Sequence, residues 1–267
     1  MTDLFVDTNG VFARSWFSAD GDADLAISKS LTLALSLFDP MHVGTKIDRA
    51  LFCWDGNRKN DKNRPDKPPG YYENREIVKA LLTEVTGVAA VTLYGEADDT
   101  VATAVAKSNA EKVIVATGDK DLHQLSDSRT KIYCLNKHSF LSKRDICSKW
   151  GVKSPLHIAI ALAITGDKID NIKGVSGWGD KRAKSVLEGL PDNCTFDEAV
   201  SEAMAIIPEE KHEEFTSALT LTLLDQGLDG VPEATPVNFM PLEKAESSGI
   251  TRISPEYVSV AMNYLPT

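Results

Sequence analysis

The chain has 267 residues, of which 42% are hydrophobic and 25% are charged, and this composition is ordinary for a globular protein with a packed core. No apolar run approaches the ~18–20 residues that a membrane span needs, and the segment MTDLFVDTNG lacks the basic and apolar regions of an export signal. The formal net charge of −10 excludes a uniformly basic surface, but it leaves room for local basic surfaces that contact phosphate.

The first third of the chain alternates short apolar runs with helical patterns. Residues 4–7 predict a buried strand, and residues 24–38 carry apolar side chains at helical spacing and predict the helix that follows. Residues 49–56 predict a second buried strand. The next stretch, 57–70, is basic and rich in Pro and Asn, which is typical of a loop or an arch.

The same alternation continues over the middle of the chain. Residues 72–87 predict a helix that stops at a glycine, and residues 88–94 predict a strand. The segment GEADD opens a further helix with acidic residues in its first turn. Residues 112–118 predict the most clearly buried strand, and residues 131–135 a short one. Repeated β–α alternation predicts the α/β class, with a parallel sheet flanked by helices.

From about residue 150 the patterns are helical. Residues 155–165 predict one helix and residues 196–224 predict two, broken at Pro208, while residues 225–242 are rich in Pro and Gly and predict no regular structure. A short helix is expected at about 255–264. The expected domains are an α/β domain at 1–150, a helical region at 151–225 and a tail at 226–267 that packs on the body.

The four cysteines show neither a Cys-x-x-Cys pair nor the spacing of zinc ligands. They stand at positions 53, 134, 147 and 194. We expect free, buried thiols in a reducing compartment, which is the cytoplasm.

Two short stretches are basic in spite of the overall charge. Residues 58–67 hold five basic side chains against two acidic ones, a net charge of +3, and residues 168–184 have the same balance. Such stretches predict two surfaces that can contact phosphate groups.

Acidic side chains recur where predicted strands end and where a helix begins beside them. The carboxyl ends of parallel strands share one edge of a sheet, so these side chains should converge there. Gathered carboxylates repel one another, and bound cations would relieve that repulsion. Each residue alone could instead cap a helix or form a turn, but their coincidence predicts a metal site. The candidates are Asp7, Asp55, Glu96, Asp98, Asp99, Asp119, Asp121, Asp167 and Asp170.

An acidic cluster without histidine partners suits phosphodiester hydrolysis. Mg²⁺ prefers oxygen ligands, and two such ions ~4 Å apart can clamp the attacking and the leaving oxygen of a phosphodiester. Phosphoryl transfer depends mainly on positioning and charge neutralisation, which bound ions supply.

Five motifs follow one another along residues 4 to about 190: LFVDTNG, FCWDG, GEADD, TGDKDL and GDKIDNIKGVSGWGDKRA. With them the chain resembles the 5′-nuclease (flap endonuclease) superfamily, and within it bacteriophage 5′-3′ exonucleases and the 5′-nuclease domain of bacterial DNA polymerase I. The resemblance implies a PIN-like catalytic domain followed by a helix–three-turn–helix region. It implies a first ion among Asp7, Asp55, Glu96 and Asp98, and a second among Asp119, Asp121 and Asp167 with Asp98 shared, while Asp99 and Asp170 act through water.

The same resemblance implies the cofactors and the contacts with DNA. Two Mg²⁺ ions are expected, with Mn²⁺ able to substitute, and a K⁺ ion at the helix–three-turn–helix. Glycines in this element let the backbone approach phosphate groups, and basic side chains beside them position the duplex. The residues expected to contact DNA are Arg58, Lys59, Lys173, Gly174, Gly177, Gly179, Lys181, Arg182 and Lys184.

The basic arch departs from the family pattern, which carries a longer segment with a Tyr-Lys-x-x-Arg type of motif. One alignment places NDKNR at the motif and nominates Lys62 and Arg64 for the scissile phosphate. Another places YYENR there, nominates Arg75 and puts Tyr72 where lysine is expected. The KPPGYY segment suits the first alignment better, and both remain open.

The expected function is that of a structure-selective 5′-3′ exonuclease and flap endonuclease. Its partner would be double-stranded or branched DNA with a 5′ end, with RNA of RNA–DNA hybrids as a further substrate, and it would act as a monomer in phage-type replication, recombination or DNA degradation. A PIN-type ribonuclease is the alternative enzyme, but it would lack the GDKIDNIKGVSGWG block. A non-catalytic module that binds branched DNA would have lost some of the acidic residues, and none is lost.

Overall fold

The computed structural model describes residues 1–56, 67–168 and 170–241, and the chain divides into two compact units. The sheet unit comprises residues 1–118, 133–140 and 226–267, and the helical unit comprises residues 119–132 and 141–225. These units are discontinuous along the chain, so the expected division at 1–150, 151–225 and 226–267 stays a prediction. The predictions at Arg58, Lys59, Lys62, Arg64 and the helix at 255–264 lie outside the described residues.

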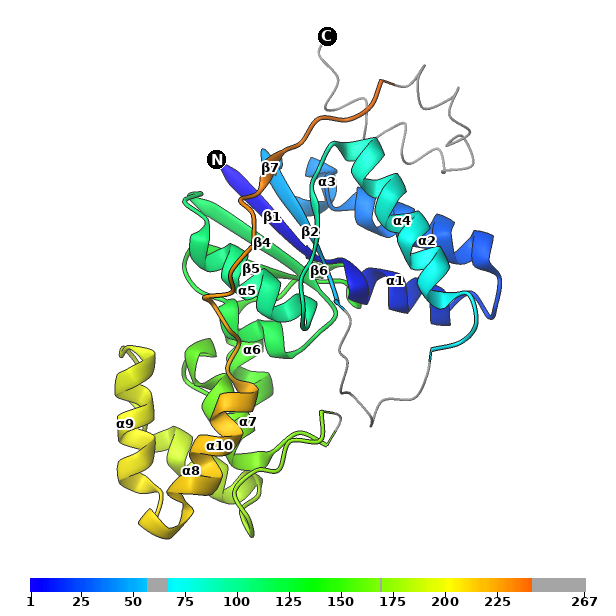
Figure 1. Ribbon diagram of the computed structural model, residues 1–267. Helices are drawn as coiled ribbons and strands as arrows, with labels where there is room; N and C mark the ends of the chain where they lie inside the picture. Colours follow the sequence, from blue (N-terminus) through cyan, green and yellow to red (C-terminus); the bar gives the residue numbers. More distant parts are fainter. Residues whose placement is uncertain (57–66, 169, 242–267) are drawn as a thin grey trace. The chain divides into compact units, whose positions relative to one another are not determined.

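The sheet has seven strands in the described part of the chain (Figure 1). They are β1 (Thr2–Asp7), β2 (Arg49–Trp54), β3 (Ala90–Thr92), β4 (Lys112–Thr117), β5 (Thr130–Cys134), β6 (Ser139–Phe140) and β7 (Thr235–Pro236). The order is β3-β2-β1-β4-β5-β6, and β7 pairs with β2. β1 runs parallel to β2 and β4, with Asp7 beside Cys53 and Val6 beside Ala116. The carboxyl ends of these three strands therefore lie at the same edge of the sheet.

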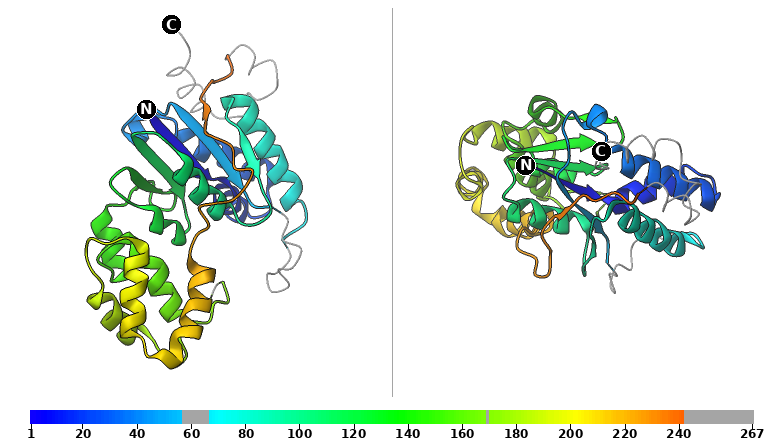
Figure 2. Two further views of the ribbon diagram at one scale, coloured as in Figure 1. Left: turned by 60° about the vertical axis from the view of Figure 1, so that its left-hand side comes forward. Right: turned by 90° about the horizontal axis from the view of Figure 1, so that it is seen from above.

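Helices cover both faces of this sheet (Figures 1 and 2). On one side lie α1 (Thr8–Phe17), α2 (Ala23–Ser36) and α4 (Tyr71–Thr86), and on the other α5 (Ala97–Lys107). Leu4 and Val6 of β1 belong to the core under the first group, while Phe5 between them is buried on the opposite side. Burial on both faces explains why these strands are apolar throughout instead of alternating.

Helix α1 was not expected, because the sequence after residue 7 suggests a polar turn. Asp7 instead caps a helix: its Oδ1 accepts a hydrogen bond of 2.9 Å from the backbone N–H of Gly10. Val11, Phe12 and Trp16 are then buried at helical spacing. The motif DTNG therefore starts a helix and fixes the Asp7 carboxylate at its N-terminus.

The other helices of the sheet unit begin and end where their residues predict. The side chain of Asp22 accepts from the N–H of Leu25 at 2.9 Å and caps α2. Helix α4 ends at Gly87, which has the left-handed φ of 64° that favours glycine and confirms the expected stop. A short helix, α3 (Pro40–Val43), precedes β2.

An ion pair ties the opposite edge of the sheet together. Arg49 donates two hydrogen bonds to the fully buried Asp3, at 2.9 and 2.8 Å. Ser108 Oγ donates a third to Asp3 Oδ2 at 2.7 Å. The buried carboxylate is thus fully engaged and joins β1, β2 and the end of α5.

The helical unit has its own core. It contains α6 (Lys143–Trp150), α7 (Ile158–Thr165), α8 (Asp180–Gly189), α9 (Phe196–Ile206) and α10 (His212–Thr222), with 3₁₀ turns η1 (Asp121–Leu125), η2 (Pro155–His157) and η3 (Glu209–Lys211). Helix α7 is apolar on every side and buried, and α10 packs against it. Thr222 of α10 donates to the carbonyl of Ala159 at 2.9 Å. The expected break at Pro208 is confirmed.

The predicted α/β class with a parallel sheet is confirmed, with further local corrections. Helix α6 lies where no element was expected, and β7 forms within the stretch expected to be irregular. The four cysteines are free, but only Cys53 is buried and the other three are partly exposed. In the described residues no helix combines the length and the apolar character that a membrane crossing requires.

Candidate functional site

Asp7 stands at the end of β1 and is held at both carboxylate oxygens. Oδ1 accepts from Gly10 at the start of α1, and Oδ2 accepts from the hydroxyl of Thr117 at the end of β4, at 3.0 Å. Only 8% of Asp7 is exposed. Two adjacent strands and one helix therefore fix this carboxylate at the carboxyl edge of the sheet, as the sequence predicts.

Asp55 follows β2 and connects it to two helices. Its Oδ2 accepts from Asn9 Nδ2 of α1 at 2.6 Å, and its Oδ1 accepts from the N–H of Ala97 at the start of α5 at 2.8 Å. The carbonyl of Leu93 leaves no room for a side chain at Gly56, since an added Cβ would come within 1.7 Å of it. This close packing allows the chain to turn immediately after Asp55.

The hydrogen bond to Ala97 brings the acidic start of α5 next to Asp55. Glu96 is the N-cap residue, and Asp98 and Asp99 lie in the first turn, all three partly buried. Asp98 Oδ1 accepts from the N–H of Asp99 at 2.9 Å. Five predicted residues thus stand on neighbouring segments at this edge of the sheet, and we name them the sheet-edge acidic group: Asp7, Asp55, Glu96, Asp98 and Asp99.

Two polar atoms beside this group are buried without a hydrogen-bond partner in the described structure. Asn9 donates to Asp55, but its Oδ1 is unpaired, and the hydroxyl of Tyr71 is also unpaired. Burial raises the pKa of Tyr71 to about 12, with a further contribution from the charge of Asp55, while Arg75 acts in the opposite direction. Tyr71 therefore stays neutral and lies within the electrostatic reach of the acidic group.

Arg75 is the one arch candidate within the described residues. Its Nη1 donates to the carbonyl of Asp55 at 3.3 Å, its Nη2 pairs with Glu76 at 3.0 Å, and its guanidinium lies 5.3 Å from the ring centre of Tyr72. Arg75 is thereby tied to the backbone beside the sheet-edge acidic group. Lys62 and Arg64, which the other alignment nominates, lie outside the described residues.

The remaining predicted carboxylates belong to the helical unit. Asp121, Asp167 and Asp170 bring carboxylate oxygens within 4.8 Å of one another, and we name these three residues the loop acidic group. Among the described residues, no other set of three or more such side chains meets this distance, so the sheet-edge acidic group is less tightly gathered. Asp119 is exposed, and its Oδ1 accepts from the N–H of Asp121 at 2.8 Å.

The negative charge of the loop acidic group is only partly neutralised by the surrounding protein. Burial and then the charge of Asp119 raise the pKa of Asp121 to about 7, with Lys120 opposing and Asp170 and Asp167 adding to the rise. Its Oδ1 is buried with no hydrogen-bond partner in the described structure. The Lys120 ammonium pairs with Asp167. Burial lowers the pKa of Lys120, but this hydrogen bond and the neighbouring carboxylates raise it overall.

These features fit a hard divalent cation. The donors are carboxylate oxygens, which Mg²⁺ and Mn²⁺ prefer. An orphaned buried oxygen and a raised pKa both indicate negative charge that the protein alone does not neutralise. The loop acidic group is therefore the best-supported metal site in the described residues.

The loop that carries Asp167 is closed by two glycines packed backbone to backbone. Gly166 has a φ of 74°, and a Cβ there would lie 2.5 Å from the nitrogen of Gly174; a Cβ on Gly174 would lie 2.4 Å from the nitrogen of Gly166. Asp167 and Ile172 exchange backbone hydrogen bonds of 2.9 and 2.7 Å across the loop. Gly174, predicted to contact DNA, is thus also required to shape the acidic loop.

The rest of the glycine block, residues 174–179, leads into α8. Gly177 has a φ of 73° with open space around it, and Gly179 is the N-cap of α8. The predicted basic side chains Lys173, Lys181, Arg182 and Lys184 are all exposed. Arg182 lies 5.4 Å from the ring centre of Trp178. This arrangement suits contacts with phosphate groups, which stay a prediction.

A carboxylate from α10 holds the middle of the glycine block. Glu214 accepts from the N–H of Ser176 at 2.5 Å and from its hydroxyl at 2.9 Å, and Lys211 pairs with Glu214 at 2.9 Å. The hydrogen bond from the Ser176 backbone, then those from Lys211 and the Ser176 hydroxyl, lower the pKa of Glu214 to about 2. The turn is therefore clamped by a permanently charged residue.

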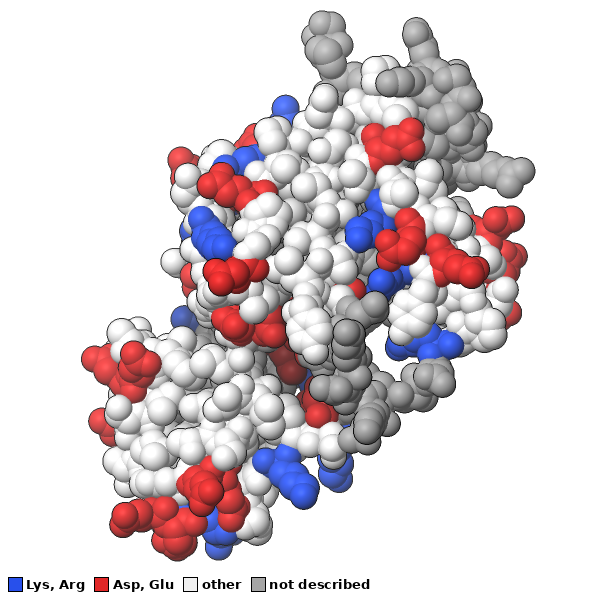
Figure 3. Space-filling model, in the orientation of Figure 1, with Lys and Arg blue, Asp and Glu red and all other residues white. Residues whose placement is uncertain are grey.

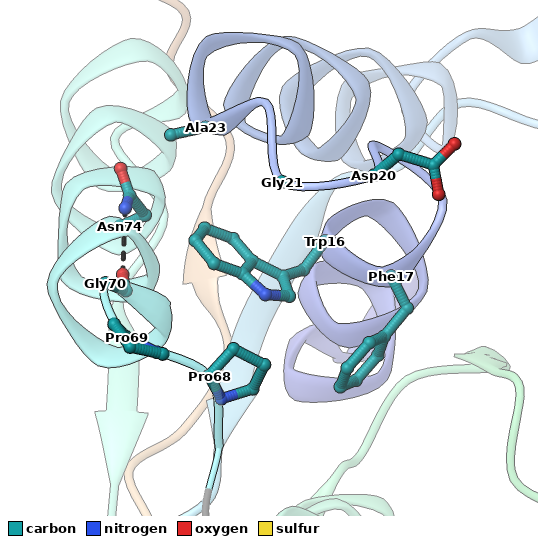
Figure 4. Close-up of a pocket in the computed structure, with 9 residues that line it drawn as sticks. All are labelled: Trp16, Phe17, Asp20, Gly21, Ala23, Pro68, Pro69, Gly70 and Asn74. Atoms are coloured by element: carbon teal, nitrogen blue, oxygen red, sulfur yellow. Dashed lines mark hydrogen bonds between the residues drawn. The ribbon is translucent and has the colours of Figure 1, made fainter.

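A pocket of about 490 Å³ lies elsewhere in the sheet unit (Figure 4). Trp16 and Phe17 from α1, the Asp20–Ala23 turn and the Pro68–Gly70 segment line it, and Asn74 donates to the carbonyl of Gly70 at 2.8 Å. It contains none of the predicted metal ligands.

On the face shown in Figure 3, basic side chains occur in small groups between acidic ones, in keeping with the negative net charge.

Several residues that shape the site were missed from the sequence. Asn9, Gly10, Thr117 and Lys120 stand inside the motifs. Gly10 donates to Asp7 of its own motif, but the partners of Asn9, Thr117 and Lys120 lie on other segments, so spacing alone could not assign them. Glu214 stands outside the motifs, and nothing in its local sequence indicates a contact 38 residues away.

Comparison with known proteins identifies the family of the chain. The sequence profile of the 5′-3′ exonuclease, N-terminal resolvase-like domain, matches residues 3–151. The chain is 36% identical to DNA polymerase I of Pseudomonas aeruginosa over 131 residues, which are 48% of this chain and 14% of that protein. It is 35% identical to a 5′-3′ exonuclease of Aquifex aeolicus over 131 residues, 48% of this chain and 44% of that protein. The chain thus spans less than half the length of these two relatives.

Solved structures show the same fold over nearly the whole chain. A structure of the T5 5′-exonuclease with divalent zinc ions bound has a TM-score of 0.63 and 14% identity, covering 99% of this chain and 98% of that one. The catalytic core of Rad2 in complex with a DNA substrate has a TM-score of 0.61 and 13% identity, covering 98% and 92%. Since the family profile matches more than half of the residues, the chain belongs to the 5′-3′ exonuclease family.

Proposed function

We propose that the chain is a structure-selective 5′-3′ exonuclease and flap endonuclease that hydrolyses DNA phosphodiesters, and also RNA in RNA–DNA hybrids. The observation that carries the proposal is the loop acidic group, whose gathered carboxylates offer a cation several oxygen ligands, among them the Asp121 Oδ1 atom that has no hydrogen-bond partner in the described structure. Family membership supports the reaction class. A phage-type role in replication, recombination or DNA degradation, acting as a monomer, belongs to the same proposal.

Two Mg²⁺ ions, or Mn²⁺ in their place, are the proposed cofactors. The loop acidic group together with Asp119 would hold one, and the sheet-edge acidic group would hold the other. When bound, such ions supply charge neutralisation at the phosphodiester and activation of the attacking water. A K⁺ ion at the glycine block is part of the proposal through the resemblance alone.

The protein's own residues would position the substrate. Arg75 presents a guanidinium beside the sheet-edge acidic group and can neutralise a phosphate oxygen. The N–H groups and basic side chains at the start of α8 would bind duplex phosphates without reading bases. Substrate recognition then depends on DNA structure instead of sequence, and cleavage would leave a 5′-phosphate.

A gel assay with 5′-labelled flap, nicked and blunt duplexes, with Mg²⁺ or with EDTA, tests the function. Cleavage is expected only with the metal, and Asp119→Ala should lower its rate by roughly 10³-fold while duplex binding persists. Asp197→Ala, which removes an exposed carboxylate in α9, is the matched control and should cleave normally. Near wild-type cleavage by Asp119→Ala would show that the metal assignment is wrong.

A further inference from the structure

Lys120 occupies the loop acidic group from within the TGDKDL motif. Its ammonium contacts Asp167 Oδ2, and its neighbours in the chain are Asp119 and Asp121. Asp167 is almost fully buried, with 5% of its side chain exposed, whereas a third of the Lys120 side chain is exposed. The Lys120 ammonium can therefore move toward solvent, whereas the Asp167 carboxylate stays in the interior.

The ion pair of Lys120 with Asp167 reduces the electrostatic repulsion among the carboxylates of the loop acidic group. Three carboxylates lie within 4.8 Å, and the opposing charge of Lys120 is one of the influences acting on Asp121. One positive charge compensates only part of this negative charge, and the Asp121 Oδ1 atom still lacks a hydrogen-bond partner in the described structure. Lys120 thus stabilises the loop acidic group, but it neutralises only part of the negative charge of its carboxylates.

A divalent cation and this ammonium compete for the same carboxylate. Lys120 contacts Asp167 Oδ2, an oxygen that a hard cation can also take, and two positive charges a few ångströms apart repel strongly in a partly buried site. Binding of the cation to Asp167 therefore disfavours the contact with the lysine.

We propose that Lys120 is an internal counter-ion of the loop acidic group, which a divalent cation displaces and which thereby sets the cation affinity of this group. The inference rests on the proposed function only in taking the group as a metal site. Lys120 stabilises the metal-free protein and weakens cation binding. It is a positioning residue, because it acts through Asp167.

Titration of the full-length chain with Mn²⁺ alone, followed by electron paramagnetic resonance of the free ion, measures the effect without any cleavage. Lys120→Met removes the charge and keeps the length of the side chain, so it should bind Mn²⁺ at one site about tenfold more tightly. The same variant in EDTA should melt at a lower temperature than the wild type, and saturating Mn²⁺ should abolish this difference. Lys131→Met, which removes an exposed lysine of β5, is the control and should change neither quantity.

Repeating the titration with Asp167→Asn tests whether the affected Mn²⁺ site is the loop acidic group. In that background Lys120→Met should no longer tighten Mn²⁺ binding, because the pair is already broken.

If Lys120→Met folds poorly, Lys120→Gln gives the same comparison. Unchanged or weaker Mn²⁺ binding in both Lys120 variants would overturn the inference, as would a loss of cleavage at saturating Mn²⁺ with unchanged affinity, which would assign Lys120 to the substrate. Absence of cleavage in the wild type would refute the nuclease and leave the Mn²⁺ result standing.

Discussion

Asp121 places one carboxylate oxygen in the interior of the helical unit, beside Asp167 and Asp170, where no described residue forms a hydrogen bond with it. A residue with such surroundings cannot be recognised from the sequence, which shows only an acidic residue after a strand. The sequence does predict that Asp121 belongs to a metal site. The sequence does not predict the surroundings of each Asp121 carboxylate oxygen, because the loop of Asp167 that lies beside it is some 46 positions further along the chain.

Without metal, the titration of Asp121 should make stability depend on pH. Its pKa is raised from 3.8 to about 7 in the folded protein, so the folded state binds more protons than the unfolded state between these values. The contribution of this group to stability is therefore largest below about pH 4 and is lost as the pH rises toward 7.

Thermal melting in EDTA between pH 4 and 8 checks this dependence. Asp121→Asn, which cannot ionise, should flatten the slope over that window. A slope that is equal in the variant and in the wild type would assign the pH dependence to other groups.

Thr117 and Thr130 provide a matched pair of buried hydroxyls. Thr117 Oγ1 donates to Asp7, whereas the Thr130 hydroxyl has no hydrogen-bond partner in the described structure. Thr117→Val should lower the free energy of unfolding by about 1–3 kcal/mol and reduce cleavage, since it releases the Asp7 carboxylate.

Thr130→Val changes the same atoms and removes no hydrogen bond of the described structure, so its free energy of unfolding should equal or exceed that of the wild type. Urea denaturation of both variants measures the difference. Equal losses in the two variants would mean that the bond to Asp7 contributes nothing.

At the scale of elements, most strands and helices of the sheet unit were predictable, because parallel strands buried on both faces are continuous apolar runs. Helix α1 was missed, since the DTNG segment has the composition of a turn and starts a helix only through the Asp7 cap. The clamp on the glycine block could not be predicted either. Its parts, Ser176, Lys211 and Glu214, lie on different elements.

Glu214→Gln should loosen residues 174–179, because the amide is a weaker acceptor than the carboxylate for the N–H of Ser176. Hydrogen exchange at this N–H is expected to rise, and duplex affinity to fall severalfold, while the melting temperature changes little. Glu213→Gln alters the exposed neighbour on the same helix and serves as the control. Unaltered exchange at Ser176 would show that the clamp does not order the turn.

At the scale of the molecule, the sequence indicated the family, which the profile match confirms, but not that each unit is discontinuous along the chain. The chain is acidic overall, with a net charge of −10, so any duplex contact must come from local basic side chains. Lys181 and Lys184 are exposed near the start of α8, where the family resemblance places the duplex.

Replacing both lysines by alanine should reduce the slope of log Kd against log salt by about two, one for each phosphate contact. Fluorescence anisotropy with a labelled duplex at several salt concentrations gives this slope. The control is Lys131→Ala with Lys137→Ala, which removes two exposed lysines elsewhere. If both double variants give the same slope, α8 is not part of the duplex contact.

The sheet unit is assembled from three separate stretches of the chain, and its last strand, β7, is contributed after the whole helical unit has been made. On the ribosome, β2 can pair with β3 at Phe52–Trp54, but Arg49 and Ala50 must wait for residues 235–236 before that end of the strand is paired on the same edge. A stop codon between residues 118 and 235 would leave the sheet without β7, and neither unit can be obtained by cutting the gene once. Obtaining the sheet unit alone requires two designed linkers, one that joins residue 118 to residue 133 and one that joins residue 140 to residue 226.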